Sequence, residues 1–200
     1  TAVLDLGTGG GERLAGMRAD LPDRVVATES WHLNAPIAQD RLRPLGVDVV
    51  RAWSEGGALP FADGSFDLVI DRHEGLDPAE VARVLRGGGT LVTQQVYRHD
   101  RQEQRRYFPR MTDFGDDLVQ YGQAFEALGC EVETSHHDHP VAYPSLGQLV
   151  YLICVSPWEI EDFDLDADLD ALLALETDCL TEDGVVLTEC RYLLTARKPD

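Results

Sequence analysis

The chain has 200 residues, 44% of them hydrophobic, and carries 36 acidic side chains against 17 lysines and arginines, for a net charge of −19. This size predicts one globular domain over residues 1–200, and no apolar run approaches the roughly 18 residues of a membrane-spanning helix. Such an acidic surface disfavours a nucleic-acid substrate, because binding there depends on neutralising phosphates.

The chain opens on a short apolar run, an acid and a cluster of glycines. Val3, Leu4 and Leu6 predict a buried strand, and residues 12–17 predict the start of a helix. Between them, Asp5 precedes glycines at positions 7, 9, 10 and 11, which permit a tight turn and a close approach to a ligand. Strand, glycine-rich turn and helix form the first unit of a doubly wound α/β fold.

The spacing of these glycines discriminates between cofactors. In a dinucleotide-binding turn, the third glycine of G-x-G-x-x-G would fall at position 12, where the chain has Glu12. An acid there would repel a diphosphate. This argues against one alternative function for the chain, that of a nicotinamide-dependent oxidoreductase. Asp5 is equally unfavourable to a phosphate but suits a cationic amino group.

A second strand, predicted over residues 24–28, ends at another acid, Glu29. An acid at the end of the second strand is placed to accept hydrogen bonds from two ribose hydroxyls. The alternative is an N-cap for the helix that begins near Trp31. We favour the ribose role because the motif that contains Asp5 and the acid Glu29 lie as far apart in the sequence as this fold leads us to expect.

Three stretches resemble motifs of the class I S-adenosylmethionine (SAM)-dependent methyltransferases. Residues 5–11 resemble the first motif, acid-apolar-Gly-x-Gly-x-Gly, and residues 59–70, LPFADGSFDLVI, look like the turn and fourth strand of the small-molecule type. Within that strand, Phe66, Leu68 and Ile70 are expected to alternate into the core. Residues 80–92 are similar to the next helix, a glycine stop and the fifth strand, with Gly87 in place of a usual proline. The likeness is close over residues 2–96 and includes features of a poorly characterised bacterial branch.

The resemblance implies a SAM site at the ends of the first four strands. Gly7 and Gly9 would back the methionine part of the cofactor, Asp5 would orient its amino group, and Glu29 would take the ribose. Trp53 and the two residues after it would edge the adenine, and Asp71 would face the sulfonium. The residues implied to bind SAM are Asp5, Gly7, Thr8, Gly9, Glu29, Ser30, Trp53, Ser54, Glu55 and Asp71.

Methyl transfer from a sulfonium is an in-line displacement, so most of the catalysis comes from positioning the acceptor. A base is needed only where the acceptor carries a proton. His73 and Glu74, just past the fourth strand, are the catalytic candidates, followed by His99. The alternative for His73 is a cap on the following segment. We expect no metal: the three histidines within residues 136–139 read better as a polar strand end.

The second half of the chain predicts a helix over residues 114–128, a sixth strand over 130–134 and a terminal strand over 185–197. About fifty residues separate the last two strands, far more than a turn. We therefore expect a helical cap inserted over residues 140–183. The predicted fold is α/β and doubly wound, a mostly parallel, seven-stranded Rossmann-like sheet with an antiparallel last strand and a helical insertion between strands 6 and 7.

Two further groups of residues have simple interpretations. The arginines at 98, 101, 105, 106 and 110 predict an exposed cluster paired within a helix, in preference to an anion site. The four cysteines are widely spaced and lack a C-x-x-C pair, which predicts free thiols in a reducing cytoplasm.

The leading hypothesis is therefore a cytoplasmic, SAM-dependent methyltransferase that acts on a small molecule as a monomer or homodimer. The alternatives are a non-catalytic or ligand-sensing protein of the same fold, or an RNA or protein methyltransferase. The superfamily usually has N-terminal helices that cover the cofactor, whereas this sequence starts inside its first strand. We therefore expect a fragment, a trimmed form or a minimal member of the family.

Overall fold

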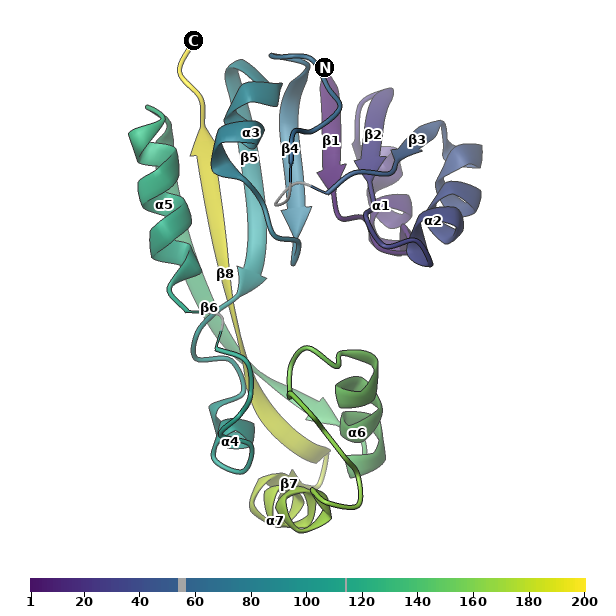
Figure 1. The fold of residues 1–200 in the computed structure, drawn as a ribbon, viewed down its shortest axis with the longest axis vertical. Helices are drawn as coiled ribbons and strands as arrows, with labels where there is room; N and C mark the ends of the chain where they lie inside the picture. The colour runs from purple at the N-terminus through teal and green to yellow at the C-terminus, as the bar shows by residue number, and fades with distance from the viewer. Residues whose placement is uncertain (54–56, 114) are drawn as a thin grey trace. The chain divides into compact units, whose positions relative to one another are not determined.

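The computed structural model describes residues 1–53, 57–113 and 115–200. Its eight-stranded sheet has the order β3-β2-β1-β4-β5-β8-β6, with β7 paired to β8 beside this path (Figure 1). The strands are β1 (Ala2–Leu6), β2 (Arg24–Thr28), β3 (Val47–Val50), β4 (Phe66–Arg72), β5 (Leu85–Val96), β6 (Glu131–Tyr143), β7 (Leu180–Thr181) and β8 (Gly184–Arg197).

The helices alternate with the strands over the first part of the chain, as the doubly wound fold predicts. Strands β1 to β5 are parallel where they pair, and β8 runs against β5 in Figure 1. The predicted α/β fold class is confirmed, with β7 as a two-residue addition. The helices are α1 (Glu12–Met17), α2 (Asn34–Leu42), α3 (Pro78–Val84), α4 (Gln102–Arg105), α5 (Asp117–Ala127), α6 (Leu146–Val155) and α7 (Leu169–Cys179), with short 3₁₀ turns η1 (Arg18–Asp20) and η2 (Arg43–Leu45).

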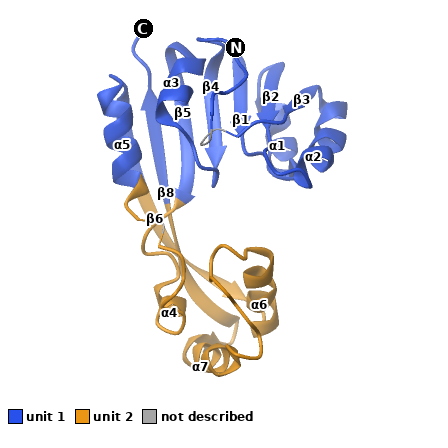
Figure 2. Cartoon of the chain, viewed as in Figure 1, with its two compact units in different colours: residues 1–95, 118–135, 192–200 blue, residues 96–117, 136–191 orange. Residues whose placement is uncertain are grey.

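The chain divides into two compact units (Figure 2). Unit 1 comprises residues 1–95, 118–135 and 192–200, and unit 2 comprises residues 96–117 and 136–191. Unit 1 holds the parallel strands and the glycine-rich turn. Unit 2 holds α4, α6, α7 and the adjoining parts of β6 and β8. The expected cap over residues 140–183 remains a prediction about domain organisation. Within the described ranges, no helix combines the length and apolarity that crossing a membrane requires.

Strand β4 is covered on both faces, so residues on both sides of the strand are buried and not only every second one. Val69 is fully buried, whereas Leu68 and Ile70 are partly buried and pack against a cluster that contains Val3 and Ala27. The expected entry of these alternate residues into the core is confirmed for Leu68 and Ile70, and Phe66 is buried as well. A parallel strand with helices on both faces buries successive residues on opposite sides of the sheet.

The glycines at 87–89 do not end the preceding helix. Helix α3 ends at Val84, and Leu85 already has an extended backbone as the first residue of β5. The glycines instead accommodate the last residues of the chain: a β-carbon on Gly87 would lie 3.1 Å from the Asp200 carbonyl carbon. The Lys198 ammonium donates 2.7 Å hydrogen bonds to the Ala82 and Leu85 carbonyls, which satisfies groups at the end of α3.

Unit 2 has its own apolar core and a buried ionic network. Strand β6 runs to Tyr143 instead of ending at the expected Thr134. Arg101 is only 4% exposed and forms ion pairs with Asp100 and Glu159. The expectation of a solvated helix or loop with intrahelical pairs is therefore wrong for Arg101, which is buried and pairs with the sequence-distant Glu159. The core residues are Phe108, Met111, Tyr143, Leu149, Ile153, Ile160, Leu172, Leu175, Val185 and Leu187.

Candidate functional site

The glycine-rich turn joins β1 to α1 at the carboxyl edge of the sheet. Gly7, Gly9 and Gly11 have φ values of 60°, 61° and 81°, a region that favours glycine over residues with a β-carbon. The Thr8 amide donates a 2.8 Å hydrogen bond to the Thr28 carbonyl, which fixes the turn against the end of β2. The repeated left-handed conformation explains why the sequence places glycine at every second position here.

The outer side of this turn is open to a ligand. A β-carbon built on Gly9 would meet no atom of the described residues within 4 Å. A hollow of about 210 Å³ runs along the turn, and its lining includes Asp5, Thr8, Arg13, Met17 and Arg72. An exposed backbone beside buried carboxylates suits a ligand that carries both a positive charge and hydrogen-bonding groups.

Asp5 lies at the floor of the hollow and is 6% exposed. Burial raises the pKa of Asp5 to about 6, while a hydrogen bond from Thr8 and the positive charge of Arg72 oppose that rise. A cationic amino group bound beside this carboxyl would favour its ionised form. The contact with the cofactor's amino group that the resemblance implies for Asp5 remains a prediction.

Glu29 follows β2 and is 5% exposed. Its Oε1 accepts a 2.7 Å hydrogen bond from the Trp31 amide, in the turn that leads to α2. The capping alternative is wrong, because α2 begins at Asn34 with Leu33 at its N-cap and no side-chain cap, so this bond belongs to the turn before the helix. Ser30 is partly buried beside Glu29, and Trp53 is 53% exposed. Ser54 and Glu55, the other implied adenine contacts, lie outside the described residues.

Asp71 lies at the end of β4 and is fully buried. Its carboxylate accepts hydrogen bonds from Thr93 Oγ1 at 2.6 Å, Gln95 Nε2 at 2.7 Å and the Glu74 amide at 3.2 Å. Burial is the main cause that raises the pKa of Asp71 to about 7. The implied sulfonium contact at this position remains a prediction.

The strand register places Asp5 and Asp71 on opposite faces of the sheet. Strand β1 pairs Asp5 with Ile70 and Leu6 with Asp71, and neighbouring side chains on a strand point to opposite sides. The two carboxyls are therefore not brought together, and Arg72 is the β4 residue that shares the face of Asp5.

The segment after β4 brings Glu74 to the glycine-rich turn. His73 is exposed and has a left-handed backbone with φ 64°, and its amide donates to the Gln94 carbonyl at 3.0 Å. A β-carbon on Gly7 would lie 2.6 Å from both Cβ and Oε2 of Glu74. Of the two catalytic candidates, Glu74 is the one that lies against the turn.

Two arginines near the turn were not anticipated from the sequence. Arg13 and Arg72 line the hollow beside Asp5 and a second, wider hollow of about 710 Å³ that also includes Glu12 and Gln94. Strand alternation combined with the register would have found Arg72, because it lies two residues beyond Ile70, the partner of Asp5. Their presence adds positive charge to a site that otherwise carries acids.

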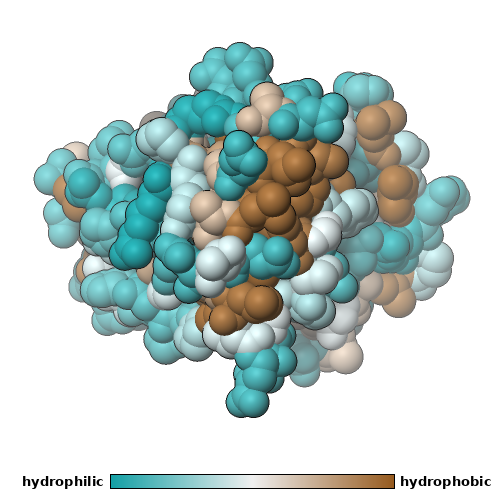
Figure 3. All heavy atoms as spheres, turned by 90° about the horizontal axis from the view of Figure 1, so that it is seen from below, coloured by the Kyte–Doolittle hydropathy of each residue, from teal (hydrophilic) through white to brown (hydrophobic). Residues whose placement is uncertain are grey.

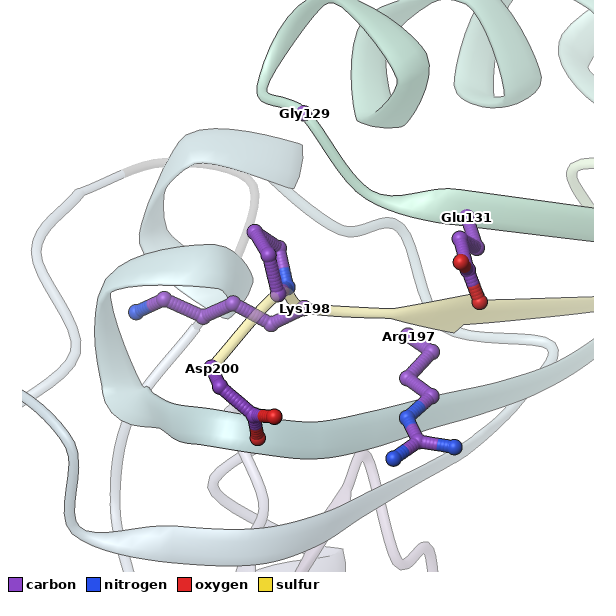
Figure 4. Close-up of a pocket in the computed structure, with 6 residues that line it drawn as sticks. Gly129, Glu131, Arg197, Lys198 and Asp200 are labelled. Carbon is purple, nitrogen blue, oxygen red and sulfur yellow. The ribbon is translucent and has the colours of Figure 1, made fainter.

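A separate hollow of about 390 Å³ lies where β6 begins and β8 ends (Figure 4). Glu131 and Arg197 come from these two strands, and Lys198 extends toward α3 beside Asp200. Because β1 to β5 start at this edge, the hollow lies at the opposite edge of the sheet from the glycine-rich turn. It contains none of the predicted site residues.

Histidines 136, 137 and 139 lie in β6. His136 stacks on Tyr97 with ring centroids 5.4 Å apart, and His137 stacks on His139 at 5.8 Å. Among residues 1–53, 57–113 and 115–200, no three His, Cys, Asp or Glu side chains are grouped to hold a metal ion. The four cysteines are free thiols.

Comparisons with known proteins point to one family and fold. Residues 4–93 match a family model described as a methyltransferase domain. No curated protein matches the chain in sequence. Similar solved structures include the YcgJ protein of Bacillus subtilis, with a TM-score of 0.72, 19% identity and coverage of 100% of this chain and 92% of that one.

Two further solved structures share the fold. A protein of Bacillus halodurans has a TM-score of 0.71 and 17% identity over 100% of this chain and 93% of its own. The precorrin-6y C5,15-methyltransferase of Geobacter metallireducens has a TM-score of 0.58 and 17% identity over 98% and 80%. At these identities the likeness shows a common architecture, not a common substrate.

Proposed function

We propose that the chain is a class I SAM-dependent methyltransferase that transfers a methyl group from SAM to a small-molecule acceptor, because residues 4–93 match a methyltransferase domain and similar solved structures include a methyltransferase. The observation that carries the proposal is the open glycine-rich turn between two buried acids, Asp5 below it and Glu29 at the end of the next strand. A positively charged amino acid joined to a nucleoside offers an amino group to one acid and ribose hydroxyls to the other.

The proposed binding roles follow the positions of these residues. Asp5 binds the amino group, the backbone of Gly7 to Gly9 lies along the methionine part, and Glu29 accepts hydrogen bonds from the ribose. Trp53, Ser54 and Glu55 would border the adenine, with Thr8 and Ser30 beside the two acids. When bound, SAM supplies a methyl group on a positively charged sulfur, which makes the leaving group intrinsically good.

The residues after β4 are proposed to position the acceptor and to receive its proton. Asp71 and Gln95 hold Glu74 through its backbone: Asp71 accepts from the Glu74 amide, and Gln95 Nε2 donates to the Glu74 carbonyl at 2.8 Å. A carboxylate held this way can accept a proton from a hydroxyl or amine acceptor. His73 is the second candidate, as an exposed base one residue earlier.

The charge of the chain supports a small acceptor. With a net charge of −19, the protein repels polyanions, so a nucleic-acid substrate would have to overcome this repulsion. Location in the cytoplasm and a monomeric or homodimeric state remain predictions.

Calorimetric titration with SAM and with its demethylated product tests the cofactor assignment. We expect both to bind, and we expect Asp5→Asn to weaken SAM binding about tenfold or more, since a charge-assisted hydrogen bond is lost. Asp48→Asn, a change at an exposed acid of β3, is the matched control and should leave binding unchanged. Binding of a nicotinamide cofactor in place of SAM would refute the proposal.

A ligand-binding protein without transfer activity is the second candidate. It is favoured by the position of Glu74, whose side chain covers Gly7. Incubation with labelled SAM and a panel of hydroxyl, amine and thiol acceptors separates the two. Transfer to any of these acceptors supports the methyltransferase, whereas tight SAM binding without transfer favours the ligand-binding protein.

A further inference from the structure

Helix α7 of unit 2 buries one face and exposes another apolar one. Leu172 and Leu175 are fully buried in the core of unit 2. Leu169 and Leu173 are 45% and 47% exposed on the same helix, and Leu165, four residues before Leu169, is 51% exposed. Leu169 and Leu173 lie on one side of the helix, because neighbours on a helix surface are three or four residues apart, and Leu165 lies in the turn just before α7. We call Leu165, Leu169 and Leu173 the leucine row.

Other apolar side chains of unit 2 are also exposed. Tyr151 and Trp158 are 69% and 61% exposed, and Leu180 is 59% exposed. The view in Figure 3 shows a continuous brown, hydrophobic area bordered by teal, hydrophilic side chains. Exposed apolar areas of this kind, bordered by polar residues, commonly mark interaction sites.

The charge around the leucine row is predominantly negative, although Arg110 forms an ion pair with Asp168 there. Residues 140–190 contain twelve Asp and Glu residues and no Lys, Arg or His. Asp166 and Asp170, which alternate with the leucines, are both exposed. A partner must therefore offer apolar side chains to the leucines and positive charge to the acids.

This charge pattern selects one kind of partner. A second copy of the chain would bring the same acids against each other, and like charges across an interface oppose association. Nucleic acids and anionic membranes would be repelled for the same reason. A basic amphipathic helix satisfies both requirements, because its apolar stripe matches a row of helix side chains and its flanking Lys and Arg reach the acids.

We propose that the leucine row of α7, with Asp166 and Asp170 beside it, is a docking surface for a basic amphipathic helix of a protein partner. Helix α7 has 11 residues, or about 16 Å at the usual rise, which corresponds to about three turns of the partner helix. The surface lies within unit 2 and does not depend on the proposed methyl transfer.

Fluorescence anisotropy of a labelled 18-residue peptide with a leucine stripe and lysines on its other face tests the proposal on the full chain. We expect micromolar binding that weakens with salt. The double change Leu169→Gln/Leu173→Gln should weaken binding about tenfold or more. The change Asp166→Asn/Asp170→Asn should weaken it several-fold and reduce the salt dependence. Circular dichroism melts check that each variant folds, which exposed positions should permit.

A matched control and four other outcomes make the test decisive. Ile37→Gln/Leu45→Gln changes two comparably exposed side chains of unit 1 and should leave peptide binding intact. Equal binding of a peptide with glutamates in place of lysines would overturn the proposal, as would unchanged binding by the leucine variant. A dimer in sedimentation that the leucine variant abolishes would assign the surface to a second copy. Capture of the chain by phosphatidylcholine vesicles would assign it to a membrane.

Discussion

The side chain of Glu74 covers Gly7: a β-carbon at residue 7 would lie 2.6 Å from Glu74 Cβ. The left-handed backbone of His73 directs the chain back toward the turn, and Asp71 and Gln95 hold it there. The segment after β4 and the cofactor turn are thereby packed together. Residue 7 must be glycine for two reasons, its φ of 60° and the space that Glu74 occupies.

Two alanine substitutions separate the effect of the left-handed backbone from the effect of the space that Glu74 occupies. Gly9→Ala should cost about 1–2 kcal/mol, since its φ of 61° is strained for alanine but the space around it is open. Gly7→Ala carries the same strain and an overlap with Glu74, so we expect a loss of about 3 kcal/mol or more. Urea unfolding of both variants measures the difference. Equal losses would mean that Glu74 moves aside at little cost.

Two substitutions of Glu29 distinguish its hydrogen bond in the turn before α2 from ribose binding. Glu29→Gln keeps an oxygen for the Trp31 amide, so stability should be retained while the affinity for SAM falls roughly tenfold. Glu29→Ala removes the hydrogen bond to the Trp31 amide as well and should also destabilise the fold by about 1 kcal/mol. Calorimetric titration and thermal melts of each variant provide the measurements. If Glu29→Gln binds SAM as the wild type does, the acid only stabilises the turn through the Trp31 amide.

Stability should fall as the pH rises from about 4 to about 7. Burial raises the pKa of Asp71 to about 7 and that of Asp5 to about 6, so in this range the folded protein retains protons that the unfolded chain has released. The stabilising contribution of each carboxyl is complete below its pKa in the unfolded chain, and it is lost above its pKa in the folded protein. Urea unfolding between pH 4 and pH 8 should show this decline. In Asp71→Asn, the free energy of unfolding that is lost over this pH range should be smaller by about 1 kcal/mol or more. An unchanged slope in Asp71→Asn would show that Asp71 titrates normally.

The buried ionic network of unit 2 should be sensitive to one substitution. Arg101→Met leaves Asp100 and Glu159 without their shared guanidinium, which should cost about 3–5 kcal/mol. Arg98→Gln removes an exposed pair with Asp116 and should cost less than about 1 kcal/mol. Hydrogen exchange should accelerate in α6 of the Arg101→Met variant. Equal effects of the two changes would contradict the buried role of Arg101.

Local sequence patterns were sufficient for much of the fold. The second strand was expected at residues 24–28, where β2 lies, and the terminal strand began within one residue of β8. Both have apolar β-branched residues between clear turn signals. The sixth strand was predicted to end at Thr134, although β6 continues to Tyr143. Its polar second half has no apolar alternation, and it is a strand because it pairs with β8.

In the candidate site, too, local sequence predicts some features, whereas others depend on how the strands pair. The conformation of the glycine-rich turn follows from residues 5–11 alone, since glycine spacing determines where the backbone can be left-handed. The separation of Asp5 from Asp71 depends on the register between two strands, which local sequence does not specify. The pairing of Arg101 with Glu159 likewise joins residues that only the tertiary fold brings together.

Lys198 is the sole lysine of the chain, and its ammonium is bound to the carbonyls at the end of α3. Acylation would therefore modify one side chain and remove the charge that those carbonyls accept. The reactivity of this amine should rise when the C-terminal segment detaches and fall when it docks. A single acetyl group, followed by mass spectrometry, would thus report how firmly the last residues are held against the sheet.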